Sequence, residues 1–269
     1  MMSHALRKAA VAGQFYPASC SDISKQISDF NAIFDKIEID KELLSVKPRA
    51  VIVPHAGYIY SGFTANMAYR FLEKSKAKRI VVIGPSHHHY FKGISASHFE
   101  SYETPCGEIE IDNPYLFALA KEFNIGFEPK AHTQEHSTEV QMPFIKHYFP
   151  NDKVIELIYG DIEVTVLENI IDALLSNPEN LVVLSTDLSH FHNMEVAKKL
   201  DYSCLKAVEA LSVETFHDGC EACGGIGIQA LILVAKKYKL NSKLLDYRTS
   251  ADASGDKSSV VGYMSAMFY

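Results

Sequence analysis

Three short apolar runs along this chain each end at a small-residue break that is followed by a histidine. The runs and their histidines are Val51–Val53 with His55, Ile80–Ile83 with His87, and Leu181–Leu184 with His190. Runs this rich in Val, Ile and Leu are typical of strands buried on both faces of a parallel sheet. Ligands of such sheets bind beyond the carboxyl ends of the strands. The pattern predicts that the three imidazoles meet at this edge, in a metal site or a proton-transfer site.

A single histidine after a strand is more often an ordinary loop residue than a ligand. Three are harder to explain by packing, because an imidazole buries less apolar surface than leucine and must find hydrogen-bond partners. The repetition therefore favours a functional cluster.

Apolar positions recur at helical spacing between the strands. The segment 21–45 predicts an amphipathic helix, with Ile23, Ile27 and Phe30 on one face. Further helices are predicted near 63–74, 163–176, 193–210 and 225–238, and further strands near 154–159, 243–249 and 259–267. This alternation predicts an α/β fold with a mainly parallel sheet and helices on both faces. Because no linker interrupts residues 1–269, a single domain is expected.

The amino-acid composition limits the kinds of partner that this protein is expected to bind. The 269 residues are 47% hydrophobic, which is enough for a large core, and the formal net charge of −7 argues against binding to nucleic acid. No apolar stretch approaches the length of a membrane span, and the start of the chain lacks a signal-peptide core, so no membrane partner is expected.

The five cysteines do not resemble a disulfide framework, because their number is odd and their spacing irregular. A reducing cytoplasm is therefore the expected compartment. Cys220 and Cys223 form a CxxC pair, which is a weak zinc signal without a second such pair.

The segment 132–136 matches the HxxEH spacing of an inverted zinc-protease motif. That motif works only when both imidazoles project from one helix face, and this stretch has no apolar periodicity. We expect a loop here, with a helix starting near Glu139. Glu135 or His136 can still line the pocket of the strand-end histidines, and His136 is a candidate catalytic residue.

Several longer motifs resemble the Memo family. They are AGQFYP at 12–17, PHAGYIYSG at 54–62, GPSHH at 84–88, EHS at 135–137, STDLSH at 185–190 and Cys223-Gly224. Prokaryotic members are known as AmmeMemoRadiSam system protein B. The resemblance runs from about Arg7 to Tyr269, and the family name implies a functional association with AMMECR-like and radical-SAM proteins.

The resemblance implies a fold similar to class III extradiol dioxygenases, which hold non-haem Fe(II) with two histidines and a carboxylate. It implies that His55 and His87 are metal ligands and that Asp187 and His190 are the acidic residue and third histidine of the pocket. It also places the Cys223-Gly224 turn near the pocket, as a wall.

The third metal ligand is less well defined. Animal members carry a cysteine in the loop before the last strand, whereas here Ala253 falls closest to that place. Replacing a thiolate by a carboxylate favours Fe(II) over Cu(I), with Cu or Zn as alternatives. Asp252 is the candidate third ligand, followed by Asp256. The alternative is that both aspartates only cap the tight turn at Gly255.

These residues support three hypotheses of function. The first is an Fe(II)-dependent oxygenase or oxidoreductase of unknown substrate, in which Asp187 orients His190 and His190 transfers protons. The second is a protein that binds a peptide or a small molecule in the same pocket without catalysis. The third is a metal-assisted hydrolase.

Overall fold

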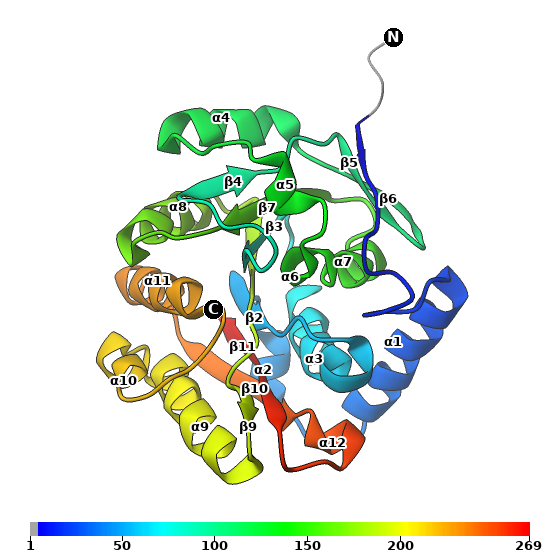
Figure 1. The fold of residues 1–269 in the computed structure, drawn as a ribbon, viewed down its shortest axis with the longest axis vertical. Coiled ribbons are helices and arrows are strands. Elements are labelled where there is room, and N and C mark those ends of the chain that lie inside the picture. Colours follow the sequence, from blue (N-terminus) through cyan, green and yellow to red (C-terminus); the bar gives the residue numbers. More distant parts are fainter. Residues whose placement is uncertain (1–4) are drawn as a thin grey trace.

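The computed structural model describes residues 5–269, and its centre is a mixed sheet in the order β10-β11-β2-β8-β3-β7-β4, with β9 paired to β11 (Figure 1). The strands of this sheet are β2 (Ala50–Val53), β3 (Arg79–Pro85), β4 (Ile94–Ala96), β7 (Lys153–Tyr159), β8 (Asn180–Ser185), β9 (His190–His192), β10 (Ser242–Thr249) and β11 (Val260–Phe268). The predicted α/β fold class is confirmed.

Within this sheet, parallel pairing joins the four central strands, β2, β8, β3 and β7. Their side chains are almost completely buried, as the runs of Val, Ile and Leu predict. The outer strands β4, β10 and β11 pair antiparallel. The carboxyl ends of β2, β3 and β8 consequently lie side by side and carry the residues that follow them to one edge.

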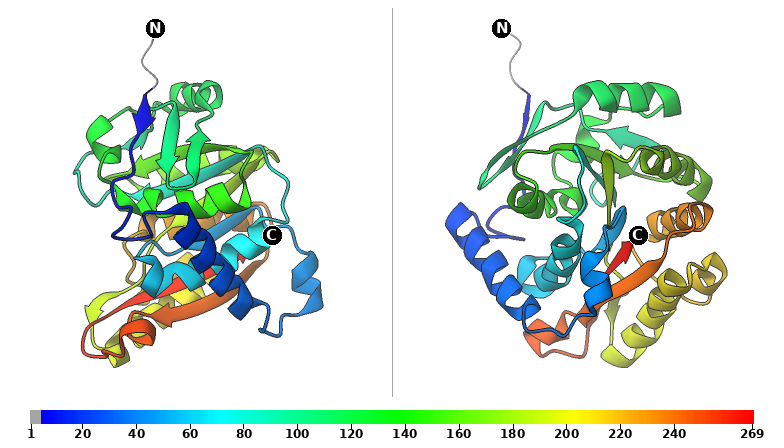
Figure 2. Two further views of the ribbon diagram at one scale, coloured as in Figure 1. Left: turned by 90° about the vertical axis from the view of Figure 1, so that its right-hand side faces the viewer. Right: turned by 180° about the vertical axis from the view of Figure 1, so that it is seen from behind.

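Helices cover both faces of the sheet (Figures 1 and 2). One face carries α8 (Val164–Ser176), α9 (Met194–Ala210), α10 (Val213–His217) and α11 (Gly225–Lys237), and the other carries α1 (Cys20–Phe34), α3 (Phe63–Leu72), α6 (His136–Glu139) and α7 (Met142–Tyr148). The remaining helices are α2 (Lys41–Ser45), the π-turn η1 (Tyr58–Gly62), α4 (Asn113–Phe123), α5 (Pro129–His132) and α12 (Ala251–Ser254). Within residues 5–269, none of the helices is long and apolar enough to cross a membrane.

Two predicted helices differ from the structure in their bounds. The segment 21–45 forms two helices, α1 and α2, because Asp40 starts a new helix by accepting the N–H of Glu42. The helix expected near Glu139 begins at Met142, and the segment before it forms the short helices α5 and α6.

The glycine-rich start of α11 is explained by close packing. A Cβ on Gly227 would lie 2.5 Å from Cδ1 of Leu184, and one on Gly224 would lie 2.5 Å from Cβ of Thr186. Both distances are too short for a real contact, so these glycines let α11 lie directly against the end of β8.

A second, three-stranded sheet was not predicted. It consists of β1 (Leu6–Arg7), β5 (Ser101–Thr104) and β6 (Gly107–Glu110). Strand β1 places Arg7 inside the protein, where its guanidinium forms a buried ion pair with Glu139 and donates to the carbonyl oxygens of His132 and Glu135. The start of the chain is thereby attached to α5 and α6.

The interpretation of the cysteines is wrong. Disulfides join Cys20 to Cys106 and Cys204 to Cys220, and Cys223 is free. An odd number of cysteines is compatible with two disulfides when the fifth cysteine is free. The spacing of the cysteines along the chain does not show which of them lie close together in the fold. The expected cytoplasmic location loses the support that it drew from the cysteines.

Replacing Arg7 by methionine should lower the free energy of unfolding by about 3–5 kcal/mol, because Glu139 would remain as a buried charge without its cationic partner. The measurement is urea denaturation followed by circular dichroism. The neighbouring Lys8→Met is the control, because the Lys8–Glu103 pair is exposed and should contribute at most about 1 kcal/mol. Equal stability of the two variants would contradict the structural role of Arg7.

Candidate metal centre

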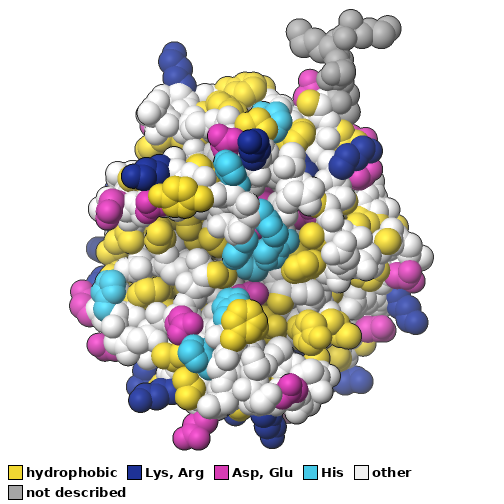
Figure 3. Space-filling model, in the orientation of Figure 1, with side chains coloured by type: hydrophobic (Ala, Val, Ile, Leu, Met, Phe, Trp, Pro, Cys, Tyr) yellow, Lys and Arg dark blue, Asp and Glu magenta, His cyan; other side chains and the backbone are white. Residues whose placement is uncertain are grey.

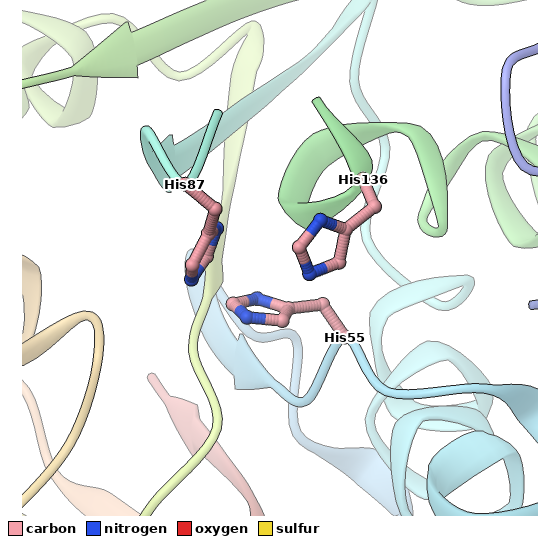
Figure 4. Close-up of side chains that lie close together, drawn as sticks. All are labelled: His55, His87 and His136. Carbon is pink, nitrogen blue, oxygen red and sulfur yellow. The ribbon is translucent and has the colours of Figure 1, made fainter. Parts of the chain in front are cut away.

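Three histidine side chains meet at the carboxyl edge of the sheet (Figure 4). His55 follows β2, His87 follows β3, and His136 is the first residue of α6. One ligand atom from each lies within 4.8 Å of the others, and the ring centroids are 4.7–5.4 Å apart. Histidine side chains gather near the middle of the face in Figure 3. The group opens to solvent, because the side chains of His87 and His136 are partly exposed.

The Nδ1 atom of each ring is held by a neighbouring group. Nδ1 of His55 lies 3.0 Å from Oγ of Ser185, and Nδ1 of His87 lies 2.9 Å from Oε1 of Glu135. Nδ1 of His136 lies 3.2 Å from Nε2 of His88. With Nδ1 occupied, Nε2 is the nitrogen of each ring that is left to bind a metal ion. Metal-binding histidines typically have this arrangement, in which a second group fixes the tautomer and the ring direction.

The glutamate behind His87 has a firmly defined position. Glu135 is fully buried and also accepts the N–H groups of His87 and Ser137. Burial raises the pKa of Glu135, but His87 and the two N–H groups outweigh it, and the pKa lies well below its usual range. Glu135 is therefore a stable carboxylate partner for His87.

Cys223 contributes a thiol to the same group. Its Sγ lies 3.4 Å from Nε2 of His55 and 3.2 Å from the main-chain N of Asp187. Burial lowers the pKa of His87, but hydrogen bonds to Cys223 and Glu135 outweigh it and raise the pKa to about 10. The sequence analysis predicted that Cys223 forms only a wall of the pocket. The sequence signal for a closer role was the Cys-Gly pair directly before α11.

The other two imidazoles are held neutral. Burial, followed by the charge of His87, lowers the pKa of His55 well below its usual value. The same two causes lower the pKa of His136 to about 4. Neutral imidazole is the form that binds metal.

Asp187 lies against His55. Its Oδ1 accepts the main-chain N–H of His55 at 2.7 Å, and its Oδ2 lies 4.0 Å from Nε2 of that ring. Burial raises the pKa of Asp187 to about 7. The role of orienting His190 stays a prediction, since both contacts of the Asp187 carboxylate described above are to His55.

His190 lies at the start of β9, near the group of three histidines. Its charge contributes to the lowered pKa of His55, and burial lowers its own pKa. Among the described residues, His190 is outside the set whose ligand atoms lie within 4.8 Å of one another. This placement leaves it available for a role other than ligation.

The two aspartates of the loop before β11 have local partners. Asp252 is in α12 and accepts the N–H and the hydroxyl of Thr249, and Asp256 accepts the N–H and the hydroxyl of Ser258. Between them, Gly255 adopts a φ of 76°. The structure therefore does not support Asp252 or Asp256 as the third ligand, and the turn-capping alternative describes both.

The two histidines of the HxxEH segment point to different places. His136 joins the site, whereas His132 is fully buried, with Nδ1 2.5 Å from Oε2 of Glu156 and Nε2 2.8 Å from Oγ of Ser95. A protease-type zinc site needs both rings on one ion. The structure does not provide that. The prediction of a loop is wrong, because the segment forms the short helices α5 and α6, but these helices direct the two rings to different places.

The donor set suits a borderline first-row metal ion. Imidazole nitrogens bind Zn, Cu, Fe and Ni, and a thiolate adds preference for softer ions. The prediction of a hard, carboxylate-ligated site was based on the absence of a nearby cysteine. Cys223 removes that basis, so the donors admit Fe(II), Cu and Zn alike.

Comparison with solved structures shows the fold. An uncharacterized protein of Escherichia coli K12 superposes with a TM-score of 0.57 at 12% sequence identity, covering 82% of this chain and 100% of that protein. This likeness agrees with the α/β architecture described above.

Sequence comparison shows the family. The model described as Memo-like protein matches residues 7–267. A MEMO1 family protein of Thermoplasma volcanium is 34% identical, over 97% of this chain and 97% of the relative. One from Saccharolobus islandicus is 32% identical, over 97% of this chain and 99% of the relative. This chain, with its three histidines at the edge of a mixed sheet, belongs to the Memo family.

Proposed function

We propose that this protein is an iron(II)-dependent oxidoreductase that acts on a small molecule at the His55–His87–His136 site. The observation that carries the proposal is the convergence of three imidazoles, each with Nδ1 held by another group and with one ligand atom within 4.8 Å of the others. Iron bound there would supply electrons for the reduction of dioxygen. The chain supplies the ligands, the proton-transfer group and the binding surface.

The residues present fit such an ion. Metal–nitrogen bonds of about 2.0–2.1 Å place neighbouring ligand atoms about 2.8–3.4 Å apart, so ligand atoms within 4.8 Å need only small side-chain rotations to close on an ion. His55 and His87 would be ligands, with Cys223 and His136 completing the set. An ion with fewer protein ligands than coordination positions keeps the remaining positions open for substrate.

His190 is the proposed proton-transfer group. It is partly buried beside the site, and its lowered pKa keeps it neutral at pH 7, able to accept a proton from substrate. The adjoining Phe191 is 79% exposed, so His190 lies close to the protein surface.

The double variant His55→Ala, His87→Ala should lose the bound metal, because it removes two nitrogen donors that other residues cannot replace. The measurement is metal content by mass spectrometry after anaerobic purification and loading with Fe(II). His217→Ala is the control, since His217 lies on α10 and should leave the content at one ion per chain. Equal metal content in the double variant and the wild type would disprove the site.

The variant Cys223→Ser tests the thiol as a donor. Loaded with Co(II), the wild-type protein should show a thiolate-to-cobalt charge-transfer band in its absorption spectrum, because Sγ lies 3.4 Å from Nε2 of His55. The serine variant should lose the band and bind Co(II) about 10–100-fold more weakly. A band of unchanged intensity in Cys223→Ser would show that the thiol is not a ligand, because the other four cysteines are in disulfides.

The variant His190→Gln should keep the metal and lower turnover by about 10²–10⁴-fold, the usual contribution of general acid–base catalysis. Oxygen consumption with a panel of small-molecule substrates measures turnover, and metal content is measured on the same samples. A wild-type protein that holds iron yet consumes no oxygen across the panel, and instead binds a peptide in a His190-dependent manner, would favour the non-catalytic hypothesis.

A further inference from the structure

The group of histidines extends from the inner site to the surface. His88 follows His87 in the turn after β3, and its exposed side chain places Nε2 3.2 Å from Nδ1 of His136. The other nitrogen of His136 is directed toward His55 and His87 (Figure 4). His136 therefore contacts the inner site with one nitrogen and His88 with the other.

The spacing of the outer pair fits a metal ion. Two imidazole nitrogens bound to one first-row ion at about 2.0–2.1 Å are separated by about 2.8–3.4 Å, for bond angles between octahedral and tetrahedral. The observed 3.2 Å lies in this range. Oε1 of Glu135 is 3.5 Å from Nδ1 of His136, so a carboxylate oxygen is also near.

We propose that His88 and His136 form a second, outer site for a borderline divalent cation, through which the ion enters the inner site. The proposal rests on the proposed function, because it requires the inner site to bind metal. A hydrogen bond between two neutral rings would give the same distance without any ion, and the experiment below separates the two.

Exposure falls from His88 at the surface to the buried His55, although the inner ligand His87 is more exposed than His136 of the outer pair. His88 is exposed, 28% of the His87 side chain and 17% of the His136 side chain are exposed, and 2% of the His55 side chain is exposed. An ion moving along this series exchanges its water molecules for nitrogen ligands a few at a time. Complete loss of hydration in one step would be far more unfavourable. The outer pair supplies the first two nitrogens while the ion is still hydrated.

His88→Gln is the test variant, because it removes the outer nitrogen at an exposed position and leaves His55, His87 and Cys223 with their own partners. The probe is Co(II), mixed with metal-free protein in a stopped-flow instrument. The thiolate-to-cobalt band of Cys223 reports filling of the inner site. We expect the filling rate to fall at least about tenfold. The equilibrium affinity of the inner site should fall less than the rate, because His88 contacts only His136, and His55, His87 and Cys223 keep their own partners.

A titration on the same samples counts the ions. Wild-type protein should bind a second, weaker Co(II) that does not change the thiolate band, and His88→Gln should lack it. The matched control is His89→Gln, the next residue, whose ring faces Glu128 at 3.6 Å and should leave both rate and stoichiometry unchanged.

The outcomes are distinguishable. An unchanged filling rate in His88→Gln would overturn the outer site, and so would an affinity loss at unchanged rate, which would make His88 a ligand of the inner ion. If wild-type protein binds no Co(II) at all, the proposed function fails as well. If wild-type protein fills normally and only the His88 effect is missing, this inference alone fails.

Discussion

The buried ion pair between Arg7 and Glu139 holds the parts of the chain on which the site depends. The carboxylate of Glu139 also accepts the N–H groups of Ala10 and Val11 and the hydroxyl of Tyr16. Buried charges are unfavourable unless they are paired and fully hydrogen-bonded, and here both charges are. The first described residues and the segment 132–139 are thereby fixed together, although they are distant in sequence. Glu135 and His136 lie in that segment, so the ion pair sets where they stand relative to the strand ends.

The strands and their histidines were predictable because burial on both faces restricts the amino-acid composition of a strand. Only Val, Ile, Leu and a few similar residues suit such strands, and parallel pairing brings their carboxyl ends together. His55 and His87 follow directly from this rule. His136 could only be suggested, because its position depends on Arg7, which is 129 residues earlier in the chain. The periodicity of apolar residues reports local structure only, so it does not reveal a contact between residues this far apart in the sequence.

The misplaced third ligand has a related cause. Asp252 and Asp256 resemble ligands in the sequence, but aspartates next to a glycine turn satisfy their carboxylates with main-chain N–H groups of the same turn. Thr249 and Ser258 provide these groups here. Cys223 reaches the site because the tight approach of α11 to β8 brings its Sγ within 3.2 Å of the N of Asp187. The close packing that the glycines of α11 allow determines where the thiol lies. A search for ligand motifs does not detect such packing.

The donor set alone does not select iron. Nitrogen and sulfur donors bind Cu(II) and Zn(II) more tightly than Fe(II), so selection in such sites comes from geometry and from metal availability. Zinc favours a closed tetrahedron, which three imidazoles and one thiolate could provide. Iron(II) uses more coordination positions, and substrate or water can fill them only if the site stays open. The solvent-facing side of the group, where His87 and His136 are partly exposed, meets that condition. Openness toward solvent, rather than the identity of the ligands, is therefore the structural feature that favours iron chemistry over a closed structural zinc site.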